Sequence, residues 1–208
     1  MIHPDTELKF IDKMLGYGVF ATADIPEGTI VYVKDSLEIC VNPLEFMLHS
    51  KPMQQVIDKY SYTDELGNRI VSWDFAKYVN HCCNCNTIST GYGFEIAIRN
   101  IAAGEQITDE YGLFNIEEEM KLTCDESCCR KKITPADFDL YHKDWDEKIK
   151  LSLRKVFEVE QPLFNLVDAY TKKELRNFIK NESLYRSVYH LKYIKEKKIN
   201  GSTAINNA

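Results

Sequence analysis

The first half of the chain alternates short apolar runs with turn residues. Runs rich in β-branched or aromatic residues, of the kind that form β-strands, occupy residues 18–22, 29–33, 37–41 and 94–99. Turn-like sequences at residues 25–28 and 102–105 precede further β-branched residues and should each lead into a strand. A short helix is expected over residues 43–50. Up to about residue 112 the pattern therefore predicts small, irregular sheets.

The periodicity changes near Pro135. Apolar side chains then recur every three or four residues, at Phe138, Tyr141, Trp145, Ile149, Leu153 and Val156, which is the pattern of a long amphipathic helix. Thr134 is expected to cap this helix, with Pro135 in its first turn, and Gln161-Pro162 to end or kink it. Similar faces up to Leu191 predict that the whole C-terminal third is helical.

Composition narrows the class of protein. The 208 residues are 44% hydrophobic and 28% charged, as in an ordinary globular domain. No run approaches the roughly 18 apolar residues that span a bilayer, and the N-terminus lacks the apolar core of a secretion signal, so we expect a protein of the cytosol or nucleus without membrane contact. Seven cysteines, most of them in two clusters, favour a reducing compartment and metal binding over a disulfide framework.

Charge is distributed unevenly along the chain. Residues 1–135 carry 12 basic and 21 acidic side chains, whereas residues 136–208 carry 14 and 11, within a net charge of −6. Nucleic-acid binding needs a basic face that displaces counterions. The acidic first part therefore argues against direct nucleic-acid binding and favours a basic partner, such as a basic protein or a lysine-rich peptide.

Three segments in the first part are candidates for chemistry. They are the glycine turn Gly16-Tyr17-Gly18, the polar segment from Tyr78 to Asn86, and the segment from Gly104 to Gly112, which ends in Asp-Glu-Tyr-Gly. Each taken alone is weak, because glycine pairs are common in turns and buried Asn–His pairs are common in cores. Their joint occurrence, with about 25 residues between the last two, is specific.

In this order the three segments resemble the signatures of the SET-domain protein lysine methyltransferase family. The resemblance covers roughly residues 7–130 and implies an α+β fold: a β-rich SET fold of small sheets with a knotted C-terminal motif. Residues 1–133 would be the SET domain, with a post-SET-like cysteine segment at about 112–133. An α-helical C-terminal extension would follow over 134–199 and a flexible tail over 200–208, and the extension would pack on the domain or on a second subunit as a homodimer.

The resemblance also implies a cofactor, S-adenosylmethionine, and places its site. The backbone of Gly16, Tyr17 and Gly18 would approach the methionine end of the cofactor, and Asn80 and His81 would complete the site. Asn80 offers an amide that both donates and accepts, while His81 would contribute backbone contacts and a structural side chain. These five residues, with Tyr111, form the predicted cofactor-binding set.

The catalytic tyrosine of the family falls on Tyr111. Methyl transfer to an amine depends on holding the reacting atoms about 3 Å apart, and tyrosines can line the narrow channel that does so. A second channel tyrosine is expected upstream, at Tyr62 or Tyr60. Asp109 stands where the family often has Phe or Tyr, so the number of methyl groups transferred is left open.

The family often binds zinc just after its catalytic tyrosine. Here Cys83, Cys124, Cys128 and Cys129 would supply four thiolates, the number that tetrahedral zinc requires. The spacing departs from the family, because adjacent Cys128 and Cys129 rarely reach one metal together. Either Cys85 substitutes or the site has been lost.

The implied function is methyl transfer to lysine side chains of a protein substrate, a histone or another basic protein. Two alternatives stay open at this stage. One is a catalytically silent SET module that binds a protein partner through its helices. The other is a zinc-binding interaction module, which rests on the cysteines alone.

Overall fold

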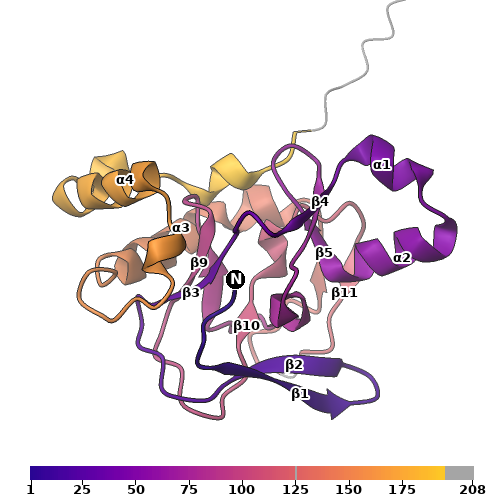
Figure 1. The fold of residues 1–208 in the computed structure, drawn as a ribbon, viewed down its shortest axis with the longest axis horizontal. Helices are drawn as coiled ribbons and strands as arrows, with labels where there is room; N and C mark the ends of the chain where they lie inside the picture. The colour runs from indigo at the N-terminus through magenta and orange to yellow at the C-terminus, as the bar shows by residue number, and fades with distance from the viewer. Residues whose placement is uncertain (125, 195–208) are drawn as a thin grey trace, which may run out of the picture.

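The chain folds into a mixed α+β structure in which small sheets are flanked by helices (Figure 1). The computed structural model describes residues 1–124 and 126–194. The strands are β1 (Thr6–Asp12), β2 (Gly16–Ala21), β3 (Ile30–Val33), β4 (Ile39–Val41), β5 (Ser61–Thr63), β6 (Arg69–Val71), β7 (Asn80–His81), β8 (Thr87–Ser89), β9 (Phe94–Ala97), β10 (Thr108–Asp109), β11 (Met120–Lys121) and β12 (Lys132–Ile133). The helices are α1 (Pro43–Leu48), α2 (Lys51–Tyr60), α3 (Asp137–Leu153) and α4 (Ala169–Lys180), with 3-10 turns η1 (Phe75–Tyr78), η2 (Tyr111–Leu113), η3 (Phe164–Leu166), η4 (Glu182–Leu184) and η5 (Val188–Leu191).

Five small sheets make up the strand portion of the residues that the structure describes. Antiparallel pairing gives the hairpin β1-β2, the pair β11-β12 and two three-stranded sheets, β3-β9-β8 and β4-β6-β5. The remaining pair, β7-β10, is parallel and aligns Asn80 with Thr108 and His81 with Asp109. The predicted α+β class with small, irregular sheets is therefore confirmed, while the knotted C-terminal motif stays a prediction.

The predicted strands and short helix are found close to their expected positions. The four apolar runs correspond to β2, β3, β4 and β9, and residues 43–50 to α1. The sequence pattern did not predict β1 or α2. Helix α2 is only 10 residues long, so it offers few repeated apolar positions by which a helix could be identified.

Helix α3 is shorter than the apolar pattern suggested. It begins at Asp137, whose Oδ1 accepts hydrogen bonds from the amide and hydroxyl of Thr134 at 3.2 and 2.7 Å. It ends at Leu153, so the prediction that Gln161-Pro162 would end it was wrong. The turn at Gly28, with a φ of +92°, packs so closely on this end that a Cβ there would lie 3.0 Å from the Ser152 carbonyl oxygen.

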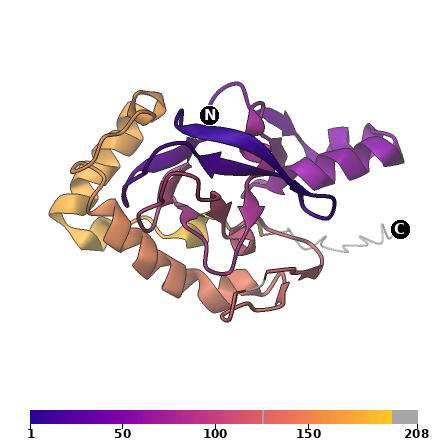
Figure 2. The same cartoon turned by 90° about the horizontal axis from the view of Figure 1, so that it is seen from below.

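The C-terminal helices share one core with the sheets. One buried cluster contains residues from both parts of the chain. From α3 and α4 it takes Phe138, Trp145, Leu175 and Phe178, and from the β3-β9-β8 sheet it takes Ile30, Ile88, Phe94 and Ile96. Figure 2 shows α3 and α4 along one side of the strand portion, with α1 and α2 at the opposite end. The apolar stripe of α3 is therefore covered by its own chain, and the domain boundary at residue 133 stays a prediction.

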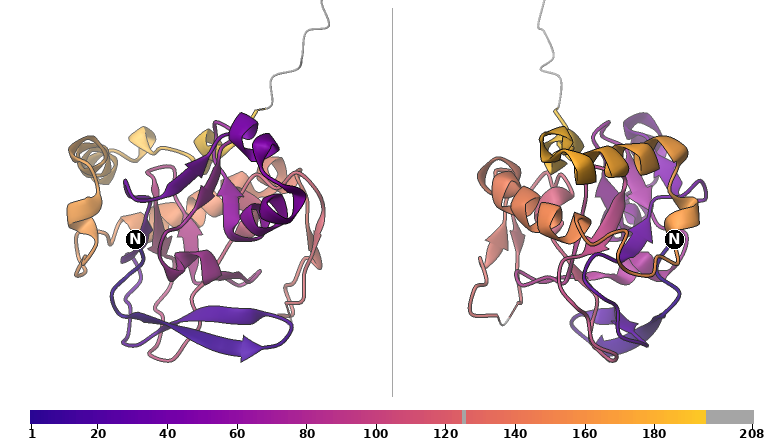
Figure 3. Two further views of the ribbon diagram at one scale, coloured as in Figure 1. Left: turned by 45° about the vertical axis from the view of Figure 1, so that its right-hand side comes forward. Right: turned by 90° about the vertical axis from the view of Figure 1, so that its left-hand side faces the viewer.

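The hairpin β1-β2 lies apart from these helices, at the other end of the molecule (Figure 3). It packs through a second buried cluster that includes Ile2, Val19, Ile25, Ala97 and Ile107. No helix within the described ranges has the length and apolar character needed to cross a bilayer. The flexible tail predicted for residues 200–208, and the last residues of the helical segment predicted up to 199, lie outside the described residues.

Candidate functional site

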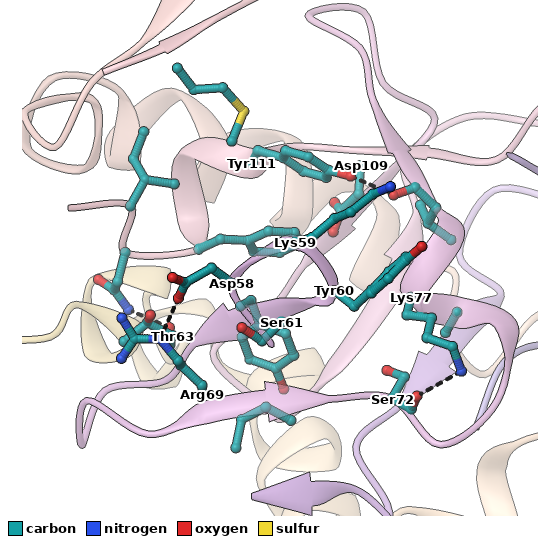
Figure 4. A pocket seen from close by; sticks show the side chains of 18 of the residues that line it. Asp58, Lys59, Tyr60, Ser61, Thr63, Arg69, Ser72, Lys77, Asp109 and Tyr111 are labelled. Atoms are coloured by element: carbon teal, nitrogen blue, oxygen red, sulfur yellow. Dashed lines mark hydrogen bonds and ion pairs between the residues drawn. The ribbon is translucent and has the colours of Figure 1, made fainter. Parts of the chain in front are cut away.

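A cavity of about 600 Å³ lies between the β4-β6-β5 sheet and the segment after Tyr111. Strand β5 lines one wall, and residues 114–120 line another. Val79, Asp109 and Tyr111 reach it from the segments that carry the sequence motifs, and Glu95 reaches it from β9. Asp109 and Tyr111 are labelled in Figure 4. The cavity thus joins the motif segments to a part of the chain that has no recognisable motif.

Several tyrosines line this cavity, including the predicted Tyr111 and Tyr62. The Tyr111 hydroxyl donates to the carbonyl oxygen of Val79 at 2.6 Å. Phe114 lies between the two rings, with centroid separations of 4.9 Å to Tyr111 and 5.4 Å to Tyr62. Burial raises the pKa of both phenols, so each stays neutral and can act as a hydrogen-bond donor.

Tyr60 and Tyr32 also line the cavity. Tyr60 was the alternative to Tyr62, and its ring packs edge-on against Tyr78 at 5.5 Å. Tyr32 was not predicted, because it sits in the apolar run of β3 and reads as a core residue. Its hydroxyl donates to Glu38 Oε1 at 2.7 Å and accepts from Ser72 at 3.1 Å.

The glycine turn and Asn80 converge, as the resemblance implied. The side-chain amide of Asn80 donates to the carbonyl oxygen of Tyr17 at 3.0 Å. A Cβ on Gly18 would lie 2.7 Å from both Gln106 Nε2 and Ile11 Cδ1, and 3.1 Å from Asn80 Nδ2. Gly16 has a φ of +76°, a conformation that favours glycine. The backbone of this turn is therefore held against Asn80 in a way that a side chain at position 18 would prevent.

His81 connects the remaining motif residues. Its Nδ1 lies 3.0 Å from the carbonyl oxygen of Asp109 and 3.3 Å from the amide nitrogen of Tyr111, and its Nε2 lies 3.4 Å from Cys83 Sγ. Burial lowers the pKa of His81, so the ring is neutral at pH 7. These contacts fit the structural side-chain role that the resemblance assigned to His81.

Two carboxyl groups lie at the inner end of the cavity. Asp109 and Glu95 both line it, and burial raises the pKa of Asp109 to about 7 and that of Glu95 well above its ordinary value. The sequence had marked Asp109 as a departure from the family. Glu95 was not predicted, although an acidic residue inside the buried strand sequence Phe-Glu-Ile-Ala is a signal that could have identified it.

Three of the predicted metal ligands come together. The Sγ atoms of Cys83, Cys124 and Cys129 lie within 4.8 Å of one another. Cys128 is exposed and lies outside this group, because the side chains of adjacent residues diverge. Cys85, the proposed substitute, is buried and also lies outside it. Three thiols at this spacing fit the soft sulfur ligands that zinc prefers and leave a fourth position for another donor.

If zinc occupies this cluster, its removal should loosen the segment between β11 and β12. Structural zinc contributes folding free energy, so chelation should lower the melting temperature by several degrees and increase hydrogen exchange in residues 122–130. Elemental analysis should give about one zinc per chain, retained in Cys128→Ser and lost in Cys129→Ser. Metal-free protein from a purification without chelators would contradict this prediction.

Comparison with known families agrees with the geometry. Residues 16–112 match the model of the SET domain family, from the glycine turn that contacts Asn80 to the Tyr-Gly pair of η2. No curated protein matches the chain closely enough to name as a relative. The matched segment contains the glycine turn, both polar motifs and the wall strands of the cavity. The chain therefore carries a segment, residues 16–112, that matches the SET domain family.

Proposed function

We propose that this protein transfers a methyl group from S-adenosylmethionine to a lysine side chain of another protein. The observation that carries the proposal is the joining of two half-sites. The glycine turn and Asn80 form one, the tyrosine-lined cavity forms the other, and the pair β7-β10 connects them, since Asn80 precedes His81 and Asp109 precedes Glu110-Tyr111. A donor and an acceptor molecule could thus meet beside Val79 and Tyr111.

The cofactor would be held by Gly16, Tyr17, Gly18, Asn80 and His81, with Tyr111 at the end nearest the cavity. When bound, it supplies a methyl group activated by a sulfonium. A side chain at Gly18 would collide with Gln106, Ile11 and Asn80, so glycine lets the turn pack directly against Asn80. Asn80 donates to Tyr17 through Nδ2 and retains its amide oxygen as an acceptor.

The cavity residues would bind and orient the lysine. The aromatic faces of Tyr62 and Tyr111 attract a cationic amine, and their neutral hydroxyls can fix its direction. Transfer requires the neutral amine, and deprotonating a lysine of pKa about 10.4 at pH 7 costs about 4.6 kcal/mol in water. Desolvation among the aromatic rings offsets part of this cost, because burial disfavours the charged form.

The mouth of the cavity favours a basic substrate. Acidic side chains outnumber the basic Lys59, Arg69 and Lys77 in the lining. The exposed Asp58, Glu118 and Glu119 can therefore attract a lysine-rich or arginine-rich segment around the target residue, although Asp58 also pairs with Arg69 and Glu119 with Lys132. A histone or another basic protein fits this charge. The proposed substrate is therefore a basic protein in the cytosol or nucleus, bound without direct contact to nucleic acid or membrane.

Incubation with labelled S-adenosylmethionine and a panel of basic proteins tests the proposal directly. Mapping by mass spectrometry should place the label on a lysine of the substrate. A protein that binds cofactor but labels nothing, and that captures a partner through its helices, would instead favour the catalytically silent module.

Substitution of Asn80 by alanine should weaken cofactor binding. The change removes the bond that holds the glycine turn and an amide that can face the ligand, so affinity should fall by about tenfold. Isothermal titration calorimetry measures this change. Asn84→Ala, in the exposed part of the same segment, is the matched control and should bind the cofactor as the native chain does. Unchanged affinity in Asn80→Ala would remove this residue from the cofactor site.

A further inference from the structure

Two acidic residues lie at the inner end of the cavity, and neither has a role in the proposed binding of the cofactor or the lysine. Glu95 lies in β9 and Asp109 in β10, and both line the cavity with Tyr62 and Tyr111. The carboxyl of Asp109 contributes to the raised pKa of Glu95, which indicates that the two groups lie close together. Figure 4 shows Asp109 beside the ring of Tyr111, on the same wall of the pocket. The pair is thus placed where a side chain entering the cavity would end.

One oxygen of Asp109 has no partner among the described residues. The residue is 1% exposed, and its Oδ1 accepts from the amide of Glu110 at 2.7 Å, whereas Oδ2 is buried without a hydrogen bond. Leaving a buried carboxylate oxygen unsatisfied costs free energy, so such an atom calls for a donor. The neighbouring Glu95 supplies one only when its own carboxyl is protonated.

We propose that Asp109 and Glu95 form a subsite that binds the primary amine of the substrate lysine. An ammonium group carries three N–H donors and a positive charge, which match the unpartnered oxygen of Asp109 and the adjacent carboxyl of Glu95. The rings of Tyr62 and Tyr111 complete the surroundings of the cation. This inference rests on the proposed function, since the amine is taken to be the methyl acceptor.

The subsite favours an amine that keeps its N–H donors. Each methyl group removes one donor, and a second transfer would turn the first methyl group toward the carboxyl oxygens. Asp109 Oδ2 would then be desolvated without a hydrogen-bond donor, and leaving a buried polar group unpaired costs free energy. The expected product is therefore monomethyl-lysine, an outcome that the sequence motifs left open.

Charge on the pair should vary near neutral pH. Burial raises the pKa of Asp109 to about 7 and that of Glu95 well above its ordinary value. Both carboxyls are therefore protonated at low pH and ionise as the pH rises. The titratable groups that face the pair are Glu110, Tyr62, Tyr111, Cys85 and the amino group of Met1. Because the Asp109 carboxyl ionises near pH 7, amine binding should strengthen from about pH 6 to about pH 7.5.

A small-molecule titration tests the subsite without a substrate protein. The probe is n-butylammonium, which reproduces the end of a lysine side chain, and binding is followed by two-dimensional NMR of the full chain. N,N,N-trimethylbutylammonium, which has the same charge and no N–H donor, should bind about tenfold more weakly. Glu95→Gln and Asp109→Asn should each reduce n-butylammonium affinity by about tenfold as well.

The controls keep the outcomes distinct. Asp144→Asn removes one negative charge from the exposed side of α3, outside the cavity lining, and should bind the probe as the native chain does. Equal affinity for both ammonium ions, or unchanged affinity in Glu95→Gln and Asp109→Asn, overturns the subsite. If Asp109→Asn has a lower melting temperature than the native chain, its loss of affinity could come from destabilisation. The affinity of Glu95→Gln then decides whether the subsite exists.

The probe requires no cofactor, so the two proposals fail separately. If S-adenosylmethionine does not bind by calorimetry while n-butylammonium binds in a carboxyl-dependent way, the subsite stands and the proposed function falls. The other outcome is that the cofactor binds and lysine is methylated, while Glu95→Gln and Asp109→Asn act on the substrate with native KM and yield the same products. In that case the subsite proposal is wrong and the proposed function stands.

Discussion

A chain truncated after Ile133 should fail to fold. The deletion removes Phe138, Trp145, Leu175 and Phe178, which form one buried cluster with the β3-β9-β8 sheet, so the apolar face of that sheet would be left open to water. It also removes Gln161, whose side chain accepts from the Ile30 amide at 2.8 Å and donates to the Gly28 carbonyl at 2.7 Å. Circular dichroism and proton NMR of the truncated chain should show no cooperative unfolding transition.

Single substitutions in the full chain provide the graded version of this test. Trp145→Ala opens a cavity beside Gly112 and Phe138 and should lower the free energy of unfolding by about 3–5 kcal/mol. Leu140→Ala, on the exposed side of the same helix, should change it by less than about 0.5 kcal/mol. A soluble, cooperatively folding truncation would show that the helices are an addition to an independent domain.

The helical third shows what local pattern can and cannot predict. The spacing of Phe138, Trp145, Ile149 and Leu153 predicted α3, because period 3.6 places them on one face. The same spacing could not say what that face covers, and both the strand domain and a second subunit were open. The answer depends on contacts with Ile88 and Phe94, which lie far away in the sequence.

The site divides in the same way. The resemblance identified Asn80, His81 and Tyr111, because these residues lie in short segments of fixed spacing. It did not identify Tyr32 or Glu95. Each lies among apolar residues of a strand, and which strand residues face the cavity is set by sheet pairing. Residues that shape a cavity from several strands leave no contiguous pattern in the chain.

The cysteines show a mixed outcome for a physical reason. Counting thiols suggested Cys83, Cys124, Cys128 and Cys129, while local geometry argued that adjacent cysteines seldom share a metal. The structure gathers Cys83, Cys124 and Cys129 and leaves Cys128 exposed. Local stereochemistry was therefore the better guide than the number of available ligands.

Tyr111→Phe should lower the turnover number by about a hundredfold while leaving cofactor affinity within about threefold of native. Its hydroxyl donates to the Val79 carbonyl at 2.6 Å and stands at the junction of the cofactor half-site and the cavity. Removing it frees that carbonyl and allows the ring to shift, and a shift of about 1 Å at a reacting group can cost about a hundredfold in rate.

Three measurements separate a catalytic effect from a structural one. Calorimetry reports cofactor affinity, steady-state kinetics on a labelled substrate separates kcat from KM, and thermal melting reports stability, which should fall by no more than about 1–3 kcal/mol for one unpaired carbonyl. Tyr170→Phe, an exposed tyrosine on α4, is the matched control and should be native in all three. Native turnover in Tyr111→Phe would exclude a role for this hydroxyl in the transfer, and a loss confined to KM would limit its role to holding the substrate lysine.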